Sequence, residues 1–92
     1  MLISYDPNKS AGNISKGRTS FEKVHDFDFS CAMVVEDTRY AYPERRFQAL
    51  SYIDDRLHML VFSPIEGGIR VISLRKANPR EVRRYEQANE AD

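Results

Sequence analysis

The sequence predicts a single α+β domain built around a mainly antiparallel sheet. Its 92 residues suffice for one domain with a modest core. Helix signals cluster near the two ends of the chain, and apolar strand patterns follow one another through short turns between them, which favours antiparallel pairing. The predicted order of elements is β-α-α-β-β-β-β-α, and we expect residues 1–92 to form one unit.

The first element is predicted to be a strand over residues 2–5, which form a short apolar run. Asp6 followed by Pro7 is a helix-start signature, because Asp caps the first turn and Pro is tolerated at the first helical position. This helix is predicted to end near Lys16, with Gly17 as the residue that stops it.

A second helix is predicted from Phe21 to about Phe29. Thr19 and Glu22 have the hydroxyl-to-carboxylate spacing of a capping box. Apolar residues at helical spacing give this helix one apolar face, which consists of Phe21, Val24 and Phe27.

The middle of the chain is predicted to form three strands. Residues 32–35 are apolar and β-branched at their end, and residues 46–53 alternate between two faces with the period of a sheet. A turn over residues 54–56 leads to residues 57–62, whose nearly continuous apolar character predicts a central strand buried on both faces. Residues 63–68 contain Pro and Gly and are predicted to end that strand.

The last strand is predicted over residues 69–74. Asn78 and Pro79 then form a second pair of capping residue and helix-start proline, which predicts a helix to about Gln87. The polar residues 87–92 are predicted to be a frayed tail.

Charge is distributed unevenly along the chain. Residues 69–86 contain six of the fourteen Lys and Arg residues and two acids, so this stretch carries +4 on a chain whose net charge is 0. Residues 22–37 carry −4, from five acids and one Lys. A basic end on a neutral chain indicates an anionic partner, of which nucleic acid is the commonest.

Composition argues against several classes of protein. No apolar run approaches the ~20 residues needed to cross a bilayer, and the first ten residues lack the basic and apolar regions of a secretory signal. Cys31 is the single cysteine, which fits a reducing cytoplasm. His25, Asp26, Asp28 and Cys31 have the side chains of zinc ligands, yet no second pair completes a tetrahedral set. We therefore expect a cytoplasmic protein with no membrane segment, metal ion or other cofactor.

Six segments occur in an order and at a spacing that match a known family. They are Tyr5-Asp6-Pro7 with Lys9 and Asn13, Ser20-Phe21-Glu22, Glu44-x-Arg46-Phe47, Arg56-Leu57, Ile69-Arg70-x-Ile72-Ser73-x-Arg75-x-Ala77 and Glu81-x-x-x-Tyr85-Glu86. Over nearly its full length the chain resembles the BrnT family of bacterial toxins, small ribonucleases of the RelE-like fold paired with a DNA-binding antitoxin. The resemblance implies a metal-independent endoribonuclease that inhibits translation and growth. It also implies an RNA substrate and a cognate ribbon-helix-helix antitoxin, through which DNA is contacted only indirectly.

The chain departs from the family pattern in two places. The family usually has Lys-His-Gly after the first helix, whereas this chain has Lys16-Gly17-Arg18. The family also commonly has a Thr-Glu-Arg type stretch after the fourth strand, where this chain has Ser63-Pro64-Ile65-Glu66. A catalytically weak or inactive member that binds antitoxin or nucleic acid is therefore the alternative to an enzyme, and a plain nucleic-acid-binding module is a third hypothesis.

The basic residues point to phosphate chemistry. A guanidinium is always charged and cannot act as a general base, but its fork binds two phosphate oxygens. Cleaving RNA without a metal ion requires alignment of the 2′-hydroxyl with phosphorus and neutralisation of charge on the equatorial oxygens. By resemblance, the catalytic residues are Arg46, Arg70, Arg75 and Tyr85, with Glu44 as the candidate base. The expected RNA-binding residues are Lys76, Arg80, Arg83 and Arg84.

Each of these residues also has a structural interpretation. Arg70 and Arg75 are alternatively partners of Glu44, Glu81 or Glu86 in ordinary ion pairs, and the arginines of the terminal helix are alternatively a solvated face. In a regular strand Arg70 and Arg75 project from opposite faces. A shared role therefore requires either a bulge or an Arg75 that lies past the end of the strand.

Two further residue types have open roles. His58 is either a proton shuttle or, more simply, a hydrogen-bonded histidine. Four tyrosines either stack on nucleobases or pack within the protein, namely Tyr5, Tyr40, Tyr42 and Tyr52.

Overall fold

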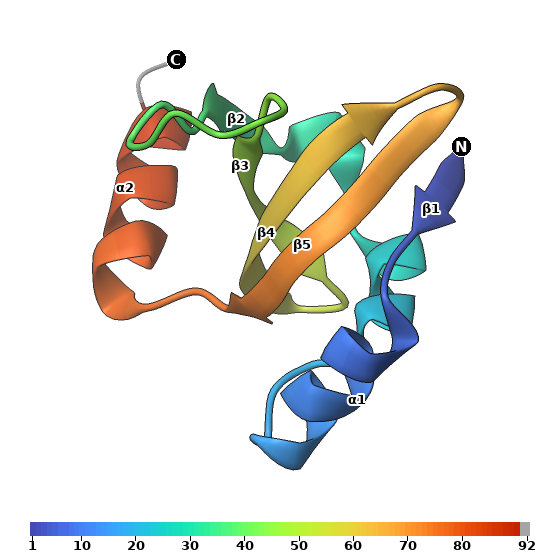
Figure 1. The fold of residues 1–92 in the computed structure, drawn as a ribbon. Helices are drawn as coiled ribbons and strands as arrows, with labels where there is room; N and C mark the ends of the chain where they lie inside the picture. Colours follow the sequence, from blue (N-terminus) through green and yellow to red (C-terminus); the bar gives the residue numbers. More distant parts are fainter. Residues whose placement is uncertain (91–92) are drawn as a thin grey trace.

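The computed structural model describes residues 1–90, which form one mixed sheet flanked by helices (Figure 1). The strands are β1 (Leu2–Ser4), β2 (Met33–Glu36), β3 (Phe47–Ile53), β4 (Arg56–Ile65) and β5 (Gly68–Lys76). Their order in the sheet is β1-β5-β4-β3-β2. β1 runs parallel to β5, whereas the β5-β4, β4-β3 and β3-β2 pairs are antiparallel. The predicted α+β class is confirmed.

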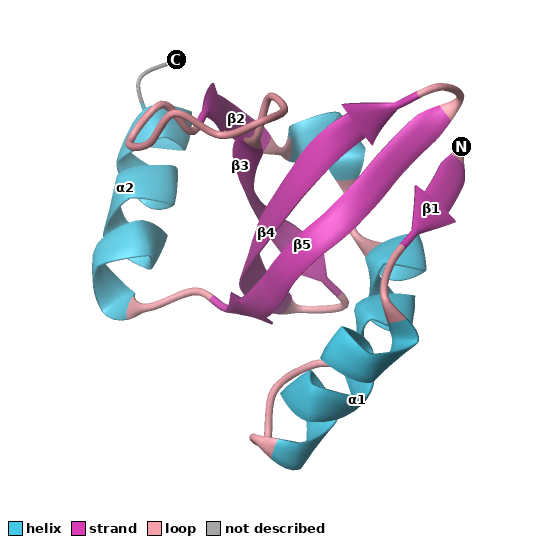
Figure 2. Cartoon of the chain, in the orientation of Figure 1, coloured by secondary structure: helices cyan, strands magenta, loops and turns pink. Residues whose placement is uncertain are grey.

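The helices lie on both sides of this sheet (Figure 2). They are the α-helices α1 (Pro7–Ser15) and α2 (Pro79–Glu90) and the short 3₁₀ helices η1 (Phe21–Asp26) and η2 (Phe29–Cys31). Within residues 1–90, none of them combines the length and the apolar composition needed to span a bilayer.

Two buried clusters occupy the two faces of the sheet. One cluster joins Phe21 and Val24 of η1 to Leu60 and Leu74 of the strands, and the other joins Tyr85 of α2 to Leu50 of β3. β4 therefore lies in the middle of the sheet with buried residues on both faces, as its apolar sequence predicts. The alternation predicted for β3 is confirmed as well, because neighbouring residues of this strand belong to different clusters.

The capping signatures at the two α-helices are confirmed. Asp6 Oδ1 accepts a 2.9 Å hydrogen bond from the Asn8 amide at the start of α1. At the start of α2, Asn78 Oδ1 accepts from the Glu81 amide at 2.8 Å, and Glu81 Oε1 accepts from the Asn78 amide at 3.0 Å. This reciprocal pair is a capping box, which satisfies two amides of the first turn.

The predicted α-helix over residues 21–29 is wrong, because this segment forms the two 3₁₀ helices η1 and η2. Phe21, Val24 and Phe27 recur every third residue, and three residues complete a turn of 3₁₀ helix, so all three are buried against the sheet. The cap is also displaced by one residue. The Ser20 hydroxyl accepts from the Glu22 amide at 3.2 Å, while the Thr19 hydroxyl contacts His58.

The predicted end of the fourth strand is wrong as well, because β4 continues through Pro64 to Ile65. β3 begins only at Phe47, which lies opposite Phe62, so the last residues of β4 have no partner from β3 on that side. Pro is tolerated at such an edge because no ladder hydrogen bond is required from its nitrogen.

The terminal helix is longer than predicted. α2 runs to Glu90, so residues 87–90 are helical and are not part of a frayed tail. The remainder of that predicted tail, residues 91–92, lies outside the described residues.

A β-bulge interrupts the pairing of β4 with β5. Val61 lies opposite Ser73, but the next residue, Phe62, lies opposite Val71, which leaves Ile72 as the extra residue of β5. An extra residue reverses the side-chain alternation downstream of the bulge.

This bulge decides the direction of two arginines. Val71 and Leu74 both point into the first core cluster although they are three residues apart. Arg70 precedes Val71 and Arg75 follows Leu74, so both arginines leave the sheet on the opposite face, the one that α2 covers in part. The bulge alternative stated for these two residues is therefore the observed one.

Gly68 is expected to be required for pairing of β1 with β5. A Cβ atom at this position would overlap the backbone carbonyl of Leu2 on the neighbouring strand, whereas a Cβ at Gly12 in α1 meets nothing within 4 Å. We predict that Gly68→Ala lowers the free energy of unfolding by about 1–3 kcal/mol. Gly12→Ala is the matched control and should leave stability unchanged or raise it by up to about 1 kcal/mol. Urea unfolding curves of both variants test this, and equal stability of the two would contradict the packing argument.

Candidate functional site

A cavity of about 390 Å³ opens on the face of the sheet that α2 covers only in part. Its floor is formed by β4 and β5 around Val61 and Ser73, and its walls by the loop between β2 and β3 and by the first turn of α2. Five charged side chains line it, namely Asp37, Arg39, Arg46, Arg75 and Glu81. Three guanidinium groups against two carboxylates give this lining a formal charge of +1.

Arg46, which immediately precedes β3, is the arginine of the cavity that has no acidic partner. Its guanidinium carbon lies 4.2 Å from the centre of the Tyr42 ring, a cation–π distance. Its Nε is buried and has no hydrogen-bond partner among residues 1–90. A buried donor without a partner costs about 1–3 kcal/mol of stability, so this group is suited to bind an anion that enters the cavity.

Arg75 is held by Glu81 across the junction between β5 and α2. Arg75 Nη1 and Nη2 donate to the two carboxylate oxygens of Glu81 at 2.8 and 2.9 Å. These hydrogen bonds lower the pKa of Glu81 and raise the pKa of Arg75. The ion-pair interpretation is therefore confirmed for Arg75, with Glu81 as its partner, although both side chains remain part of the cavity wall.

A second bidentate pair fixes the loop that forms the opposite wall. The buried Asp37 carboxylate accepts from Arg39 Nε at 2.9 Å, from Arg39 Nη2 at 2.8 Å and from the Tyr42 hydroxyl at 3.1 Å. Hydrogen bonds from Arg39 hold the pKa of Asp37 well below its usual range. Sequence reasoning missed Asp37 and Arg39 as site residues, because no strand or helix pattern positions them, and it left the role of Tyr42 open.

Two of the five predicted catalytic residues line this cavity, Arg46 and Arg75, and the other three lie elsewhere. Arg70 is exposed and donates from Nη1 to the hydroxyl of Ser4 at 3.0 Å, toward β1. Glu44 is exposed in the loop before β3, in a separate shallow hollow.

Tyr85 serves the packing of α2. It is buried, and its hydroxyl donates to the carbonyl of Cys31 at 2.8 Å. Burial raises the pKa of Tyr85 to about 12. Its ring also contacts that of Tyr52, with 5.7 Å between ring centres.

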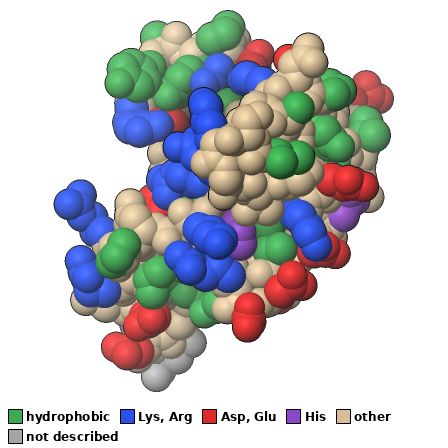
Figure 3. All heavy atoms as spheres, turned by 90° about the horizontal axis from the view of Figure 1, so that it is seen from below, with side chains coloured by type: hydrophobic (Ala, Val, Ile, Leu, Met, Phe, Trp, Pro, Cys, Tyr) green, Lys and Arg blue, Asp and Glu red, His purple; other side chains and the backbone are tan. Residues whose placement is uncertain are grey.

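The residues predicted to bind RNA lie at the surface, outside the cavity. Lys76 is the last residue of β5, and Arg80, Arg83 and Arg84 belong to α2. All four side chains are exposed. Seen from below the view of Figure 1, Lys and Arg side chains gather over the left half and the centre of the molecule, whereas most Asp and Glu lie toward its right and lower margins (Figure 3).

His58 is a buried, hydrogen-bonded histidine. Its Nδ1 lies 2.9 Å from the carbonyl of Arg56, which only accepts, so Nδ1 carries the proton. Nε2 then accepts from the Thr19 hydroxyl at 3.1 Å. Burial lowers the pKa of His58, and the charges of Arg56 and Lys76 act in the same direction.

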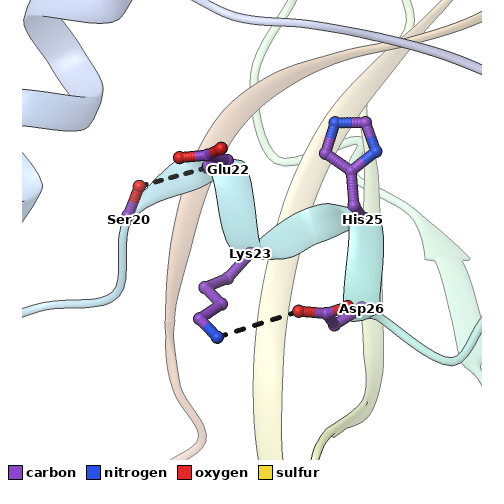
Figure 4. A pocket seen from close by; sticks show the side chains of 5 residues that line it. All are labelled: Ser20, Glu22, Lys23, His25 and Asp26. Atoms are coloured by element: carbon purple, nitrogen blue, oxygen red, sulfur yellow. Dashed lines mark hydrogen bonds and ion pairs between the residues drawn. The ribbon is translucent and has the colours of Figure 1, made fainter.

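Another hollow of the surface, about 530 Å³, lies on η1, away from the arginines of the candidate site. Ser20 Oγ caps the helix there, and Lys23 pairs with Asp26 at 3.8 Å. His25 points away from this pair (Figure 4). Two carboxylates and one lysine make it a less suitable site for phosphate than the arginine cavity.

Fold and cavity together define a small α+β protein with an arginine-lined cavity of about 390 Å³, in which the buried Nε of Arg46 has no hydrogen-bond partner among residues 1–90. The family model of the ribonuclease toxin BrnT of type II toxin-antitoxin systems matches residues 5–81. The chain therefore belongs to this family, and the five charged residues of the cavity all lie within the matched segment. A type II system implies an antitoxin partner. Comparisons with curated proteins and with solved structures gave no match.

Arg46 and Arg75, two of the three arginines that line the cavity, should differ in what they contribute to stability. Arg75→Met leaves the Glu81 carboxylate without its partner and is expected to lower the free energy of unfolding by about 1–3 kcal/mol. Arg46→Met keeps the contact with Tyr42 and removes a donor that has no acceptor, so stability should stay within about 0.5 kcal/mol of wild type or rise. Urea unfolding of both variants distinguishes them. A loss at Arg46 as large as that at Arg75 would mean that Arg46 has a partner.

The neutral form of His58 predicts a dependence of stability on pH. The folded-state pKa lies below the ordinary value of 6.5, so the unfolded state binds more protons as pH falls. Above about pH 7 His58 is neutral in both the folded and the unfolded state, so nothing is lost there. As pH falls toward 5, the unfolded state takes up the proton more readily, and the free energy of unfolding should decrease. His58→Gln should flatten this dependence, whereas His25→Gln, at an exposed histidine, should retain it. Thermal unfolding between pH 5 and 7.5 measures both, and parallel curves for the two variants would refute the assignment.

Proposed function

We propose that this protein is a cytoplasmic endoribonuclease toxin that cleaves RNA without a metal ion and thereby inhibits translation and growth. We further propose that its antitoxin is a ribbon-helix-helix protein, which alone contacts DNA. Family membership supports ribonuclease activity in general. The observation that carries the finer proposal is Arg46, which lines the cavity, pairs with no carboxylate among residues 1–90 and has a buried Nε without a hydrogen-bond partner there.

The proposed reaction is attack of a 2′-hydroxyl on the neighbouring phosphorus. As the new bond forms, negative charge increases on the two equatorial oxygens of the phosphate, and the bond to the 5′-oxygen breaks. The fork of Arg46 binds one or both of these oxygens. Arg75 supplies a second positive charge from β5, at a position that Glu81 holds in place.

Fewer residues of the cavity are suited to take the proton of the 2′-hydroxyl than to neutralise the charge of the phosphate. Glu81 is ionised at neutral pH, because its hydrogen bonds with Arg75 lower its pKa, and this makes it a weak base. Glu44, the candidate base expected from the family resemblance, reaches an RNA only if the substrate extends beyond the cavity. Catalysis in this proposal therefore depends mainly on alignment and on arginine charge.

We also propose that the fold is RelE-like. The order of the strands and helices and the position of the arginines beside the sheet and the terminal helix support this assignment.

One observation favours a second function, that of a non-catalytic binding module. Gly17 and Arg18 stand where the family usually has histidine and glycine, and no histidine lies in the arginine cavity of the described chain. A protein that neutralises phosphate but transfers no proton would bind RNA without cleaving it.

Cleavage of labelled RNA in the presence of EDTA tests the enzyme proposal. We expect folded wild-type protein to cut the RNA, and Arg46→Met to reduce the rate by about 100-fold or more, as loss of a group that stabilises transition-state charge does. Lys23→Met is the matched control, because Lys23 is a partly exposed cation on η1, outside the cavity. It should retain full activity.

The opposite results are equally informative. Wild-type protein that is folded by circular dichroism and binds RNA in a salt-dependent way, yet leaves it intact, would establish the binding module. Equal losses at Arg46 and Lys23 would show that general charge, and not the cavity, governs cleavage.

A further inference from the structure

The structure separates the four tyrosines that sequence reasoning could not distinguish. Tyr5 packs edge-on against Phe21, and Tyr52 packs against Tyr85. Tyr42 has one face covered by Arg46 and its hydroxyl bound to Asp37. Tyr40, by contrast, has 70% of its surface exposed.

Although Tyr40 is exposed, it belongs to the loop between β2 and β3, which hydrogen bonds hold in place. The amide of Asp37 donates to the carbonyl of Arg46 at 2.7 Å, which closes the loop at its base. The Asp37 carboxylate then accepts from the amide and guanidinium of Arg39 and from the hydroxyl of Tyr42. The residues on both sides of Tyr40 are thereby tied to one buried acid, so little conformational freedom remains to be lost when its ring binds a ligand.

The ring of Tyr40 packs against Tyr42, which lines the arginine cavity, whereas Tyr40 itself lines the adjoining hollow that also contains Glu44. The centre of the Tyr40 ring is 5.8 Å from that of Tyr42, whose own centre is 4.2 Å from the guanidinium carbon of Arg46. Tyr40 and the Arg46 guanidinium are thus no more than about 10 Å apart, a span comparable to that between a nucleobase and the adjacent phosphate. The Arg39 guanidinium, 6.0 Å from the Tyr40 ring, lines the same cavity.

We propose that Tyr40 stacks on an unpaired nucleobase next to the phosphate bound at Arg46, which makes single-stranded RNA the substrate class. This inference rests on the function proposed above and adds a residue that selects the substrate. Bases in a duplex are stacked on each other and do not offer a face to a protein ring, whereas bases of single strands do. Because every base has such a face, stacking at Tyr40 selects for single strands without selecting a sequence.

Binding of a non-cleavable, 2′-O-methylated single-stranded oligonucleotide tests the inference independently of cleavage. Loss of a stacked base costs about 5- to 100-fold in affinity, and Tyr40→Ala should lose that much. Tyr40→Trp should bind as well as wild type. Tyr40→Leu, which is apolar but has no π face, should resemble Tyr40→Ala. Affinity for an RNA duplex should be the same in all four proteins.

Several results would overturn the inference. If wild-type protein binds the single strand and Tyr40→Ala binds it equally well, the loop does not stack on RNA, while the proposed ribonuclease function stands. If Tyr40→Ala retains RNA affinity but no longer captures the antitoxin, the ring belongs to the protein interface instead. Wild-type protein that neither binds nor cleaves RNA would refute both proposals.

Discussion

The carboxylate of Asp37 is the group on which the candidate site depends. It is a buried charge at the end of β2, and such a charge is tolerated only when it is fully hydrogen-bonded. Arg39 and Tyr42 supply those hydrogen bonds, and in doing so they fold the loop between β2 and β3 into one wall of the cavity. Tyr42, once anchored, provides the ring on which Arg46 lies. A single buried acid therefore sets the position of a cation that it does not itself neutralise.

Glu81 and Arg75 form the corresponding pair on the other side. Glu81 has two roles, because its carboxylate accepts hydrogen bonds both from the Asn78 amide at the start of α2 and from Arg75. The terminal helix and the last strand are thus connected at the edge of the cavity. With two of the three guanidinium groups paired to carboxylates, the positive charge that remains is concentrated at Arg46. An unsatisfied buried donor is costly in a protein without function there, which is why Arg46 is the strongest indication of a binding site.

The sequence predicted the elements where local chemistry is decisive. The caps at Asp6 and Asn78, the alternation of β3 and the buried centre of β4 were all correct, because each depends on neighbouring residues only. It failed at residues 21–29, where a spacing of three suits both an incomplete α-helix face and a 3₁₀ helix. It also failed at Pro64, since a local pattern does not reveal where the neighbouring strand ends.

By itself the sequence determined the α+β class, the family and two of the residues that meet in the cavity, Arg46 and Arg75. The family match depends on the order and spacing of residues along the chain, and these can be read without any knowledge of contacts. Tertiary structure alone decided that Arg75 leaves the sheet on the same face as Arg70, because the bulge at Ile72 shifts the pairing of β5 against β4. It alone decided which arginine is neutralised and which is not, and which tyrosine remains exposed. Those outcomes depend on partners from distant elements, and a residue's own neighbours in sequence carry no information about them.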